Sequence, residues 1–143
     1  MQWNIYQPMI NEQRYHEVNR LDWSGVEWGS AYLKVTSALK GDYAELCVLN
    51  AVHYNLYEHT AIVEARDPED LFHLTNMWDN EAAILWRNKP KSGSVGDVIT
   101  TIDGETVANG CYICLSVGWR LASDDFSRWF QSKVTTHQME NAA

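Results

Sequence analysis

The strongest constraint on the fold of this chain is the helix-start signal at Asp67, where four consecutive residues read Asp-Pro-Glu-Asp. Asp67 can cap a helix, Pro68 suits the first helical position, and the two acids that follow suit the positive end of the helix dipole. One face then carries apolar residues at helical spacing: Leu71, Leu74 and Trp78. The pattern predicts an amphipathic helix over residues 67–77.

A second amphipathic helix is predicted near the end of the chain. Ser123 can cap it, two acids follow, and Lys133 suits its C-terminal end. Its apolar residues again recur at helical spacing: Phe126, Trp129, Phe130 and Val134. We expect its three aromatic residues to be mostly buried against a strand over residues 111–117. The tail at 135–143 has no pattern and is expected to fray, while a weaker amphipathic pattern predicts a third helix at 11–19.

Alternating apolar and β-branched residues predict the strands. In residues 2–6, Trp3 and Ile5 fall on one face. Further strands are predicted over residues 31–36, in the second half of 94–105 before an Asp-Gly turn at 103–104, over 111–117, and as two strands within 44–65 that turn at 58–60. Together these elements predict an α+β fold whose mostly antiparallel sheet is covered on one face by the helices that start at Asp67 and Ser123.

Length and composition bound the class of protein. The chain has 143 residues, which is the usual length of one domain, so we expect residues 1–143 to fold as a single domain. No apolar run approaches the ~20 residues that cross a bilayer, and the N-terminus lacks the features of a signal peptide. We therefore expect a cytoplasmic protein with no membrane segment. Three cysteines are too few for a disulfide framework, and we expect free thiols.

Cys111 and Cys114 have the C-x-x-C spacing that occurs in zinc and redox sites. Zinc needs four ligands, however, and the sequence offers no second pair of Cys or His at a suitable spacing. On a strand, residues three apart also point to opposite faces and cannot hold one ion. We therefore expect structural thiols, with no metal and no cofactor.

No motif of a nucleophilic, phosphate-binding or dinucleotide-binding enzyme is present. The densest group of polar and aromatic residues is His53, Tyr54, Tyr57, Glu58 and His59. Alternation in this region indicates residues on the surface of a sheet rather than a general acid–base pair. The sequence therefore favours a protein that is not an enzyme.

The negative charge of the chain is concentrated in one window. Residues 41–81 contain nine acids and one base, whereas the rest of the chain balances ten acids with ten bases, for a net charge of −8. Such a window repels nucleic acid and attracts basic protein surfaces. We therefore predict a partner-binding surface formed by Glu58, Glu64, Glu69, Asp70, Asp79 and Glu81. An ordinary solvated face is the alternative that this pattern leaves open.

A short basic segment suggests a different function, the binding of nucleic acid. Arg87, Lys89 and Lys91 lie in a loop that also contains Pro90 and a glycine. Three cations could contact phosphate groups, although they would release few counterions and bind weakly by themselves.

The segment 94–99, which reads Ser-Val-Gly-Asp-Val-Ile, resembles a motif of the YodL-like domain. The resemblance continues through Asp103-Gly104, Tyr112 and Gly118-Trp119, and the preceding helix matches as well, so it covers residues 67–121. It implies a small α+β module of phage and mobile-element proteins with no established catalytic residues. The expected function is thus that of a non-enzymatic accessory protein that binds a host or phage protein through its acidic surface.

The same segment is also similar to ASCH and other PUA-like domains, in which a Gly-Asp turn leads into a barrel strand beside a nucleic-acid or nucleotide cleft. That resemblance implies binding through Arg87, Lys89 and Lys91, which the acidic balance of the chain disfavours. Physical chemistry supplies a simpler role for the motif. Gly96 permits a backbone turn that other residues resist, and Asp97 can accept local backbone N–H bonds.

Overall fold

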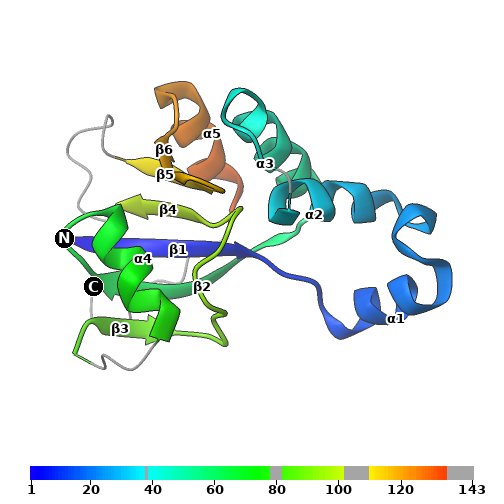
Figure 1. Cartoon of the computed structure of the whole chain (residues 1–143), viewed down its shortest axis with the longest axis horizontal. Helices are drawn as coiled ribbons and strands as arrows, with labels where there is room; N and C mark the ends of the chain where they lie inside the picture. Colours follow the sequence, from blue (N-terminus) through cyan, green and yellow to red (C-terminus); the bar gives the residue numbers. More distant parts are fainter. Residues whose placement is uncertain (38, 78–81, 102–109, 135–143) are drawn as a thin grey trace.

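A computed structural model describes residues 1–37, 39–77, 82–101 and 110–134. The chain folds as the predicted α+β class, with one six-stranded sheet in the order β3-β2-β1-β4-β5-β6 and every neighbouring pair antiparallel (Figure 1). The strands are β1 (Gln2–Pro8), β2 (Tyr57–Glu64), β3 (Ile84–Arg87), β4 (Val98–Thr101), β5 (Cys111–Leu115) and β6 (Gly118–Leu121). The helices are α1 (Glu12–Leu21), α2 (Glu27–Ser37), α3 (Ala44–His53), α4 (Pro68–Met77) and α5 (Asp124–Lys133), with short 3-10 turns η1 (Trp23–Gly25) and η2 (Gly41–Tyr43).

Strand β1 lies in the middle of the sheet and is buried on both faces. Trp3 and Ile5 pack in one apolar cluster with Leu71 of α4, whereas Tyr6 packs in the other with α2, α3 and α5. A central strand between two helical layers buries residues on both of its faces. The sequence pattern of residues 2–6 showed apolar residues on one face only and therefore did not predict that the other face is buried too.

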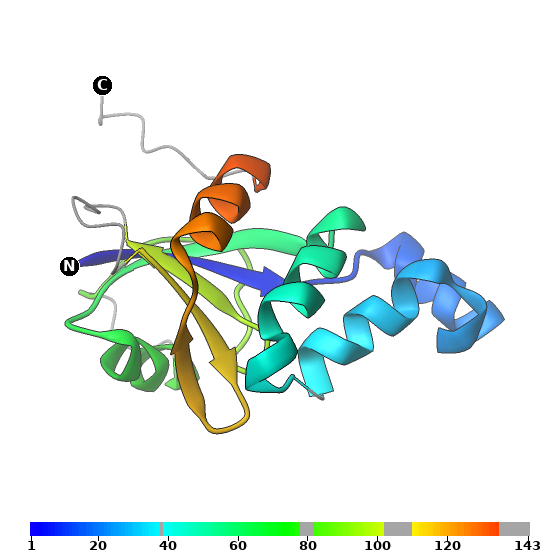
Figure 2. The same ribbon diagram turned by 90° about the horizontal axis from the view of Figure 1, so that it is seen from above.

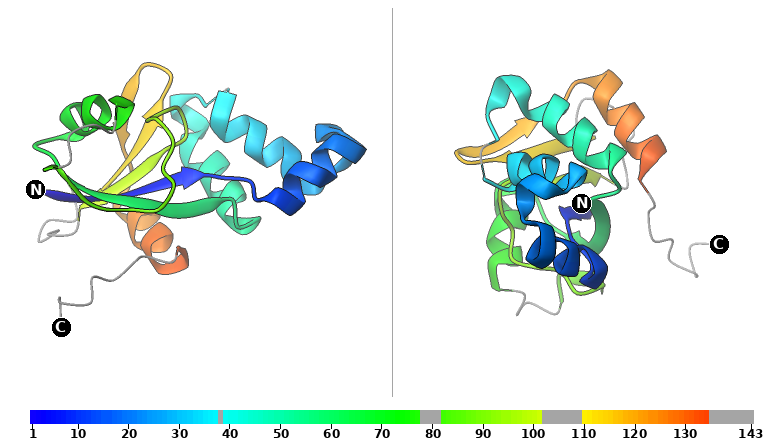
Figure 3. Two further views of the ribbon diagram at one scale, coloured as in Figure 1. Left: turned by 90° about the horizontal axis from the view of Figure 1, so that it is seen from below. Right: turned by 90° about the vertical axis from the view of Figure 1, so that its right-hand side faces the viewer.

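The helices that start after Asp67 and Ser123 lie on opposite faces of the sheet, and the prediction that both cover one face is wrong. Figure 2 shows α4 on one side and α5 on the other, and Figure 3 shows α1 and the start of α2 projecting beyond the end of the sheet. Both faces of the central strands are apolar, so each requires its own helical cover.

Two predicted strands are helices instead. Residues 31–36 belong to α2, where Ala31 and Val35 are buried, and residues 44–53 form α3, where Val48 and Ala51 are buried. Spacings of three and four residues place these side chains on one helical face, so burial of that face overrides the strand preference of their β-branched neighbours. The turn predicted at 58–60 is also wrong because these residues lie inside β2.

The predicted helix starts are confirmed by their capping contacts. The Asp67 side chain accepts a hydrogen bond from the Asp70 backbone N–H at 2.8 Å, and Ser123 Oγ accepts one from the Phe126 N–H at 3.2 Å. Phe126 and Phe130 are buried as expected, whereas Trp129 is only partly buried. Helix α1 confirms the third predicted helix. No helix in the described ranges is both long and apolar enough to cross a membrane.

Some predicted features fall outside the residues that the structure describes. These are Trp78, Asp79, Glu81, the Asp103-Gly104 turn and the tail from Thr135.

Candidate functional site

The loop at residues 91–97, called here the 91–97 loop, is fixed to the central strand β1 by Gln7. The fully buried Gln7 side chain donates from Nε2 to the Lys91 carbonyl at 2.9 Å and to Asp97 Oδ2 at 3.2 Å. Its Oε1 accepts from the Lys91 N–H at 3.1 Å and from Thr60 Oγ1 at 2.9 Å. One buried amide thus satisfies polar groups of β2 and of both ends of the loop, which holds the loop in one position.

Gly96 and Asp97 have the folding role that the sequence predicted for them. Gly96 has a φ of +94°, and its carbonyl accepts a hydrogen bond from the Tyr57 hydroxyl at 2.6 Å. Asp97 Oδ2 accepts from the Ser94 backbone N–H at 3.1 Å, which closes the turn. The 94–99 motif therefore builds the bend that leads the chain from the loop into β4.

The Asp97 carboxyl group is buried, and burial raises its pKa to about 7. Hydrogen bonds from Ser94 and Gln7 and the charge of Lys91 oppose this rise by favouring the carboxylate. Within the described part of the chain, Asp97 Oδ1 has no hydrogen-bond partner. The nearby Tyr57 hydroxyl has a raised pKa, chiefly because it is buried and also because it faces Asp97.

The 91–97 loop forms one wall of an apolar pocket of about 440 Å³, called here the hairpin pocket. Helix α4 forms a second wall and the β5–β6 hairpin a third; Figure 2 shows α4 beside this hairpin. The pocket is lined by Glu69, Phe72, Ser94, Val95, Cys114, Leu115, Ser116, Gly118 and Trp119. Phe72 and Trp119 meet edge to face, with ring centroids 6.2 Å apart. Its size and apolar lining are those of a site that accepts a ligand or a partner's side chain.

The tip of the β5–β6 hairpin projects beside the hairpin pocket. Val117 is 92% exposed, although the residues on either side of it, Ser116 and Gly118, line the pocket. Leu121 on the edge strand β6 is also exposed. An exposed apolar side chain beside a concave apolar site is typical of a protein-binding surface.

Four of the six acids predicted as one partner-binding surface are described, and Glu58 lies far from Glu64. Glu58 and Glu64 are six residues apart along β2, which separates them by roughly 20 Å. Asp79 and Glu81 lie outside the described residues. Of the described acids, Glu69 is the one that lines the hairpin pocket.

Two of the remaining acids have partners within the chain. Glu64 binds the N-terminal ammonium group at 3.1 Å. The Asp70 side chain accepts the Arg66 backbone N–H at 3.0 Å, and this bond lowers the pKa of Asp70. Asp70 therefore fixes the start of α4 together with Asp67.

The three basic residues predicted for nucleic-acid binding also differ in their environments. Arg87 and Lys89 are exposed near the end of edge strand β3. Lys91 Nζ instead donates to the Pro8 carbonyl at 2.8 Å, and burial lowers its pKa. Lys91 thus anchors the 91–97 loop and differs in this role from the exposed Arg87 and Lys89.

Cys111 and Cys114 point to opposite faces of β5, as their spacing predicted. Cys111 packs in the cluster with α3 and α5, whereas Cys114 lines the hairpin pocket. Burial raises the pKa of each thiol to about 12, so both are neutral. In the described ranges no three His, Cys, Asp or Glu side chains are grouped to hold a metal ion.

The polar and aromatic group at residues 53–59 is divided between structural contacts. His59 is buried between Tyr6 and Trp86, with ring centroids 5.0 and 4.8 Å away. The Tyr57 hydroxyl binds the Gly96 carbonyl, and Glu58 lies exposed on the surface of β2. The contacts of His59 and Tyr57 are thus packing and hydrogen-bonding contacts within the fold.

The sequence patterns did not identify the aromatic residues that line the hairpin pocket. Phe72 and Trp119 come from segments 47 residues apart, and neither has a local pattern that marks it for a pocket. The one available signal was Val117, an apolar residue beside a glycine at the turn between two short strands. Comparison of the chain with protein-family models, curated proteins and solved structures finds no match.

Proposed function

We propose that this chain is a non-enzymatic accessory protein that binds a partner protein through the hairpin pocket and the exposed hairpin tip. The observation that carries this proposal is the apolar pocket of about 440 Å³ with the 92% exposed Val117 projecting from its margin. A partner that places an apolar side chain in the pocket against Phe72 and Trp119 would bury both rings further and cover Val117. Buried aromatic residues of this kind supply much of the binding energy in protein interfaces.

The negative charge near the pocket favours a partner with basic residues. Glu69 lines the pocket, and exposed Asp67 lies two residues before it at the start of α4. A partner segment with Lys or Arg beside its apolar anchor complements these carboxylates, which increases the association rate and the specificity. Of the acids predicted as a partner-binding surface, this proposal assigns a role to Glu69 and none to Glu58.

The biological setting follows from the resemblance of residues 67–121 to the YodL-like domain, which implies a phage or mobile element as the source. The hairpin pocket is built entirely within that segment. A protein of the host cell, or a second phage protein, is accordingly the partner that we propose.

The test uses purified parent protein and variants to capture partners from a bacterial lysate. Val117→Asp places a charge on a side chain that is almost fully exposed, so it should leave folding intact and abolish capture. Glu69→Lys should slow capture at low salt. A protein that the parent retains, and that Val117→Asp does not retain, is the expected result.

Two matched controls separate binding from general effects. Tyr15→Asp adds the same charge to another exposed apolar residue, and Glu12→Lys reverses the first-turn acid of α1. Both should capture like the parent. The proposal fails if every retained protein is held equally by Val117→Asp. It also fails if the hairpin variants only abolish a dimer of this chain, measured by sedimentation, because the occupant is then a second copy.

A further inference from the structure

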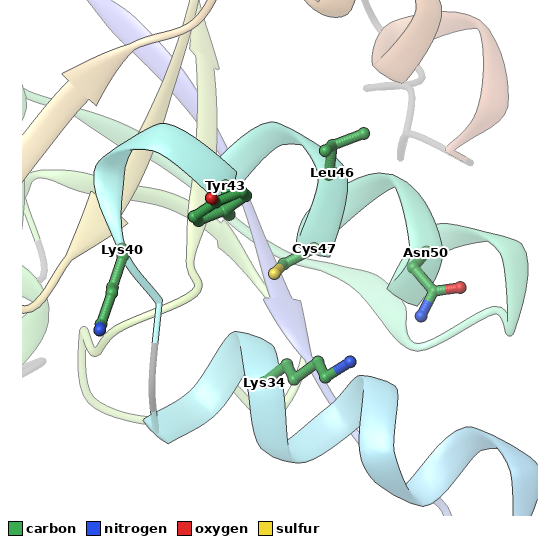
Figure 4. Close-up of a pocket in the computed structure, with 6 residues that line it drawn as sticks. All are labelled: Lys34, Lys40, Tyr43, Leu46, Cys47 and Asn50. Carbon is green, nitrogen blue, oxygen red and sulfur yellow. The ribbon is translucent and has the colours of Figure 1, made fainter.

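A second concave site lies between α2 and the η2–α3 segment, and it shares no lining residue with the hairpin pocket. This cleft, called here the α2–α3 cleft, has a volume of about 390 Å³, within the range of small-molecule sites (Figure 4). It is lined by Lys34, Lys40, Tyr43, Leu46, Cys47 and Asn50. The proposed protein-binding function does not involve it.

The charge of the α2–α3 cleft is opposite to that of the whole chain. The chain has a net charge of −8, yet two of its five lysines line this cleft and no carboxylate does. Among the described residues, the salt bridges involve neither Lys34 nor Lys40. Glu45, at the start of α3, directs its carboxylate to Ser123 Oγ at 2.7 Å. Both ammonium groups are therefore available to an anion.

The remaining lining residues add an aromatic face and hydrogen-bonding groups. Tyr43 is 62% exposed, which is a large exposure for an aromatic ring beside a cleft. Figure 4 shows the Cys47 sulfur directed into the space between the two lysines and the Asn50 amide directed toward α2. An exposed tyrosine ring can stack on a planar ring, and an amide can both donate to and accept from the edge of a base.

We propose that the α2–α3 cleft binds a nucleoside monophosphate. The ammonium groups of Lys34 and Lys40 point away from each other in Figure 4, and both would turn on their long flexible stems to contact the phosphate group. Tyr43 would stack on the base and Asn50 would hydrogen-bond to its edge. A single phosphate carries a charge that two ammonium groups can neutralise. A nucleic-acid strand carries many charges, and the acidic chain outside the cleft repels it. The ligand class is therefore a mononucleotide.

Calorimetric titration of the full chain tests this proposal with three probes: adenosine monophosphate, adenosine and inorganic phosphate. We expect saturable binding of adenosine monophosphate at one site, at least tenfold tighter than that of either part alone, and weaker at high salt. A Lys34→Gln, Lys40→Gln double variant should weaken this binding at least tenfold. Tyr43→Ala should weaken binding of the monophosphate and leave the affinity for inorganic phosphate unchanged.

Lys133→Gln is the matched control, because it removes an exposed lysine that does not line the cleft. It should bind adenosine monophosphate like the parent, and circular dichroism should show that all variants fold. Absence of saturable binding at about 1 mM adenosine monophosphate overturns the proposal. Unchanged binding in the double lysine variant overturns it as well, and so does phosphate binding as tight as that of the nucleotide.

Discussion

A Cβ atom on Gly96 would lie 2.3 Å from the carbonyl oxygen of Val35, so the 91–97 loop crosses helix α2 with no room for a side chain. The neighbouring Asp97 is held by Gln7 at 3.2 Å. Together these contacts join a helix, a loop and the central strand at one point of the fold. Gly96 and Asp97 of the 94–99 motif thus have a role in packing. Their contribution to the free energy of unfolding can be measured.

Gly96→Ala should destabilise the protein by about 2–5 kcal/mol, because it adds backbone strain at φ +94° to a collision with the Val35 backbone. Gly118 supplies the control, since its φ is +113° but nothing lies within 4 Å of an added Cβ. Gly118→Ala should therefore cost only the strain, about 1–2 kcal/mol. Urea unfolding measures both, and equal losses would contradict the close approach to Val35.

The contribution of Asp97 to the stability of the protein should fall as the pH rises from about 4 to about 7. Burial raises the pKa of Asp97 from 3.8 to about 7, so in this window the folded state holds a proton that the unfolded state has released. Three pKa units correspond to a decrease of up to about 4 kcal/mol, and stability should level off above pH 7. Asp97→Asn keeps an oxygen acceptor for Ser94 and Gln7 and removes the titration.

Thermal or urea unfolding over this pH range should therefore give a flatter profile for Asp97→Asn than for the parent. Asp42→Asn, at an exposed carboxylate, should retain the profile of the parent. An Asp97→Asn profile as steep as that of the parent would assign the pH dependence to other groups.

Phe130→Ala should cost about 3–5 kcal/mol of stability. Phe130 is fully buried and meets Tyr6 and Tyr57 edge to face, with ring centroids 5.2 and 5.8 Å away. Trp129, one residue earlier, is only partly buried, so Trp129→Ala should cost clearly less. The order of the two unfolding midpoints checks the orientation of α5, and the reverse order would require a rotation of this helix.

Cys111 and Cys114 should bind no zinc, because their side chains lie on opposite faces of β5 and their thiols are neutral. Elemental analysis of protein purified without added metal checks this expectation. Stoichiometric zinc in the parent that disappears in Cys111→Ser would refute it.

The starts of helices α4 and α5 could be predicted because the capping residues lie next to the helices in the sequence. The capping bonds of Asp67 and Ser123 each join residues three positions apart, so all participating groups lie within one short stretch of sequence. Helical spacing of the aromatic residues in α5 likewise predicted that Phe126 and Phe130 would be buried. The class of the fold followed from these helices and the alternating strands.

Local patterns could not distinguish a helix from a strand at residues 31–36 and 44–53, because short apolar runs satisfy both periods. Both segments form helices in the structure, in which Val35 and Val48 are buried in the core cluster. The concentration of acids in the 41–81 window likewise did not predict how these side chains are arranged in space. Folding placed Glu58 and Glu64 at opposite ends of one strand.

The sequence by itself determined where the best helices start, the α+β class, and the divergence of Cys111 from Cys114, since each depends on neighbours along the chain. The tertiary structure alone decided which face each helix covers, the hairpin pocket and the α2–α3 cleft. Gln7 illustrates the reason, because its partners Lys91 and Asp97 lie 84 and 90 residues away in the sequence. Contacts over such separations form only when the sheet brings the segments together, and no local pattern encodes them.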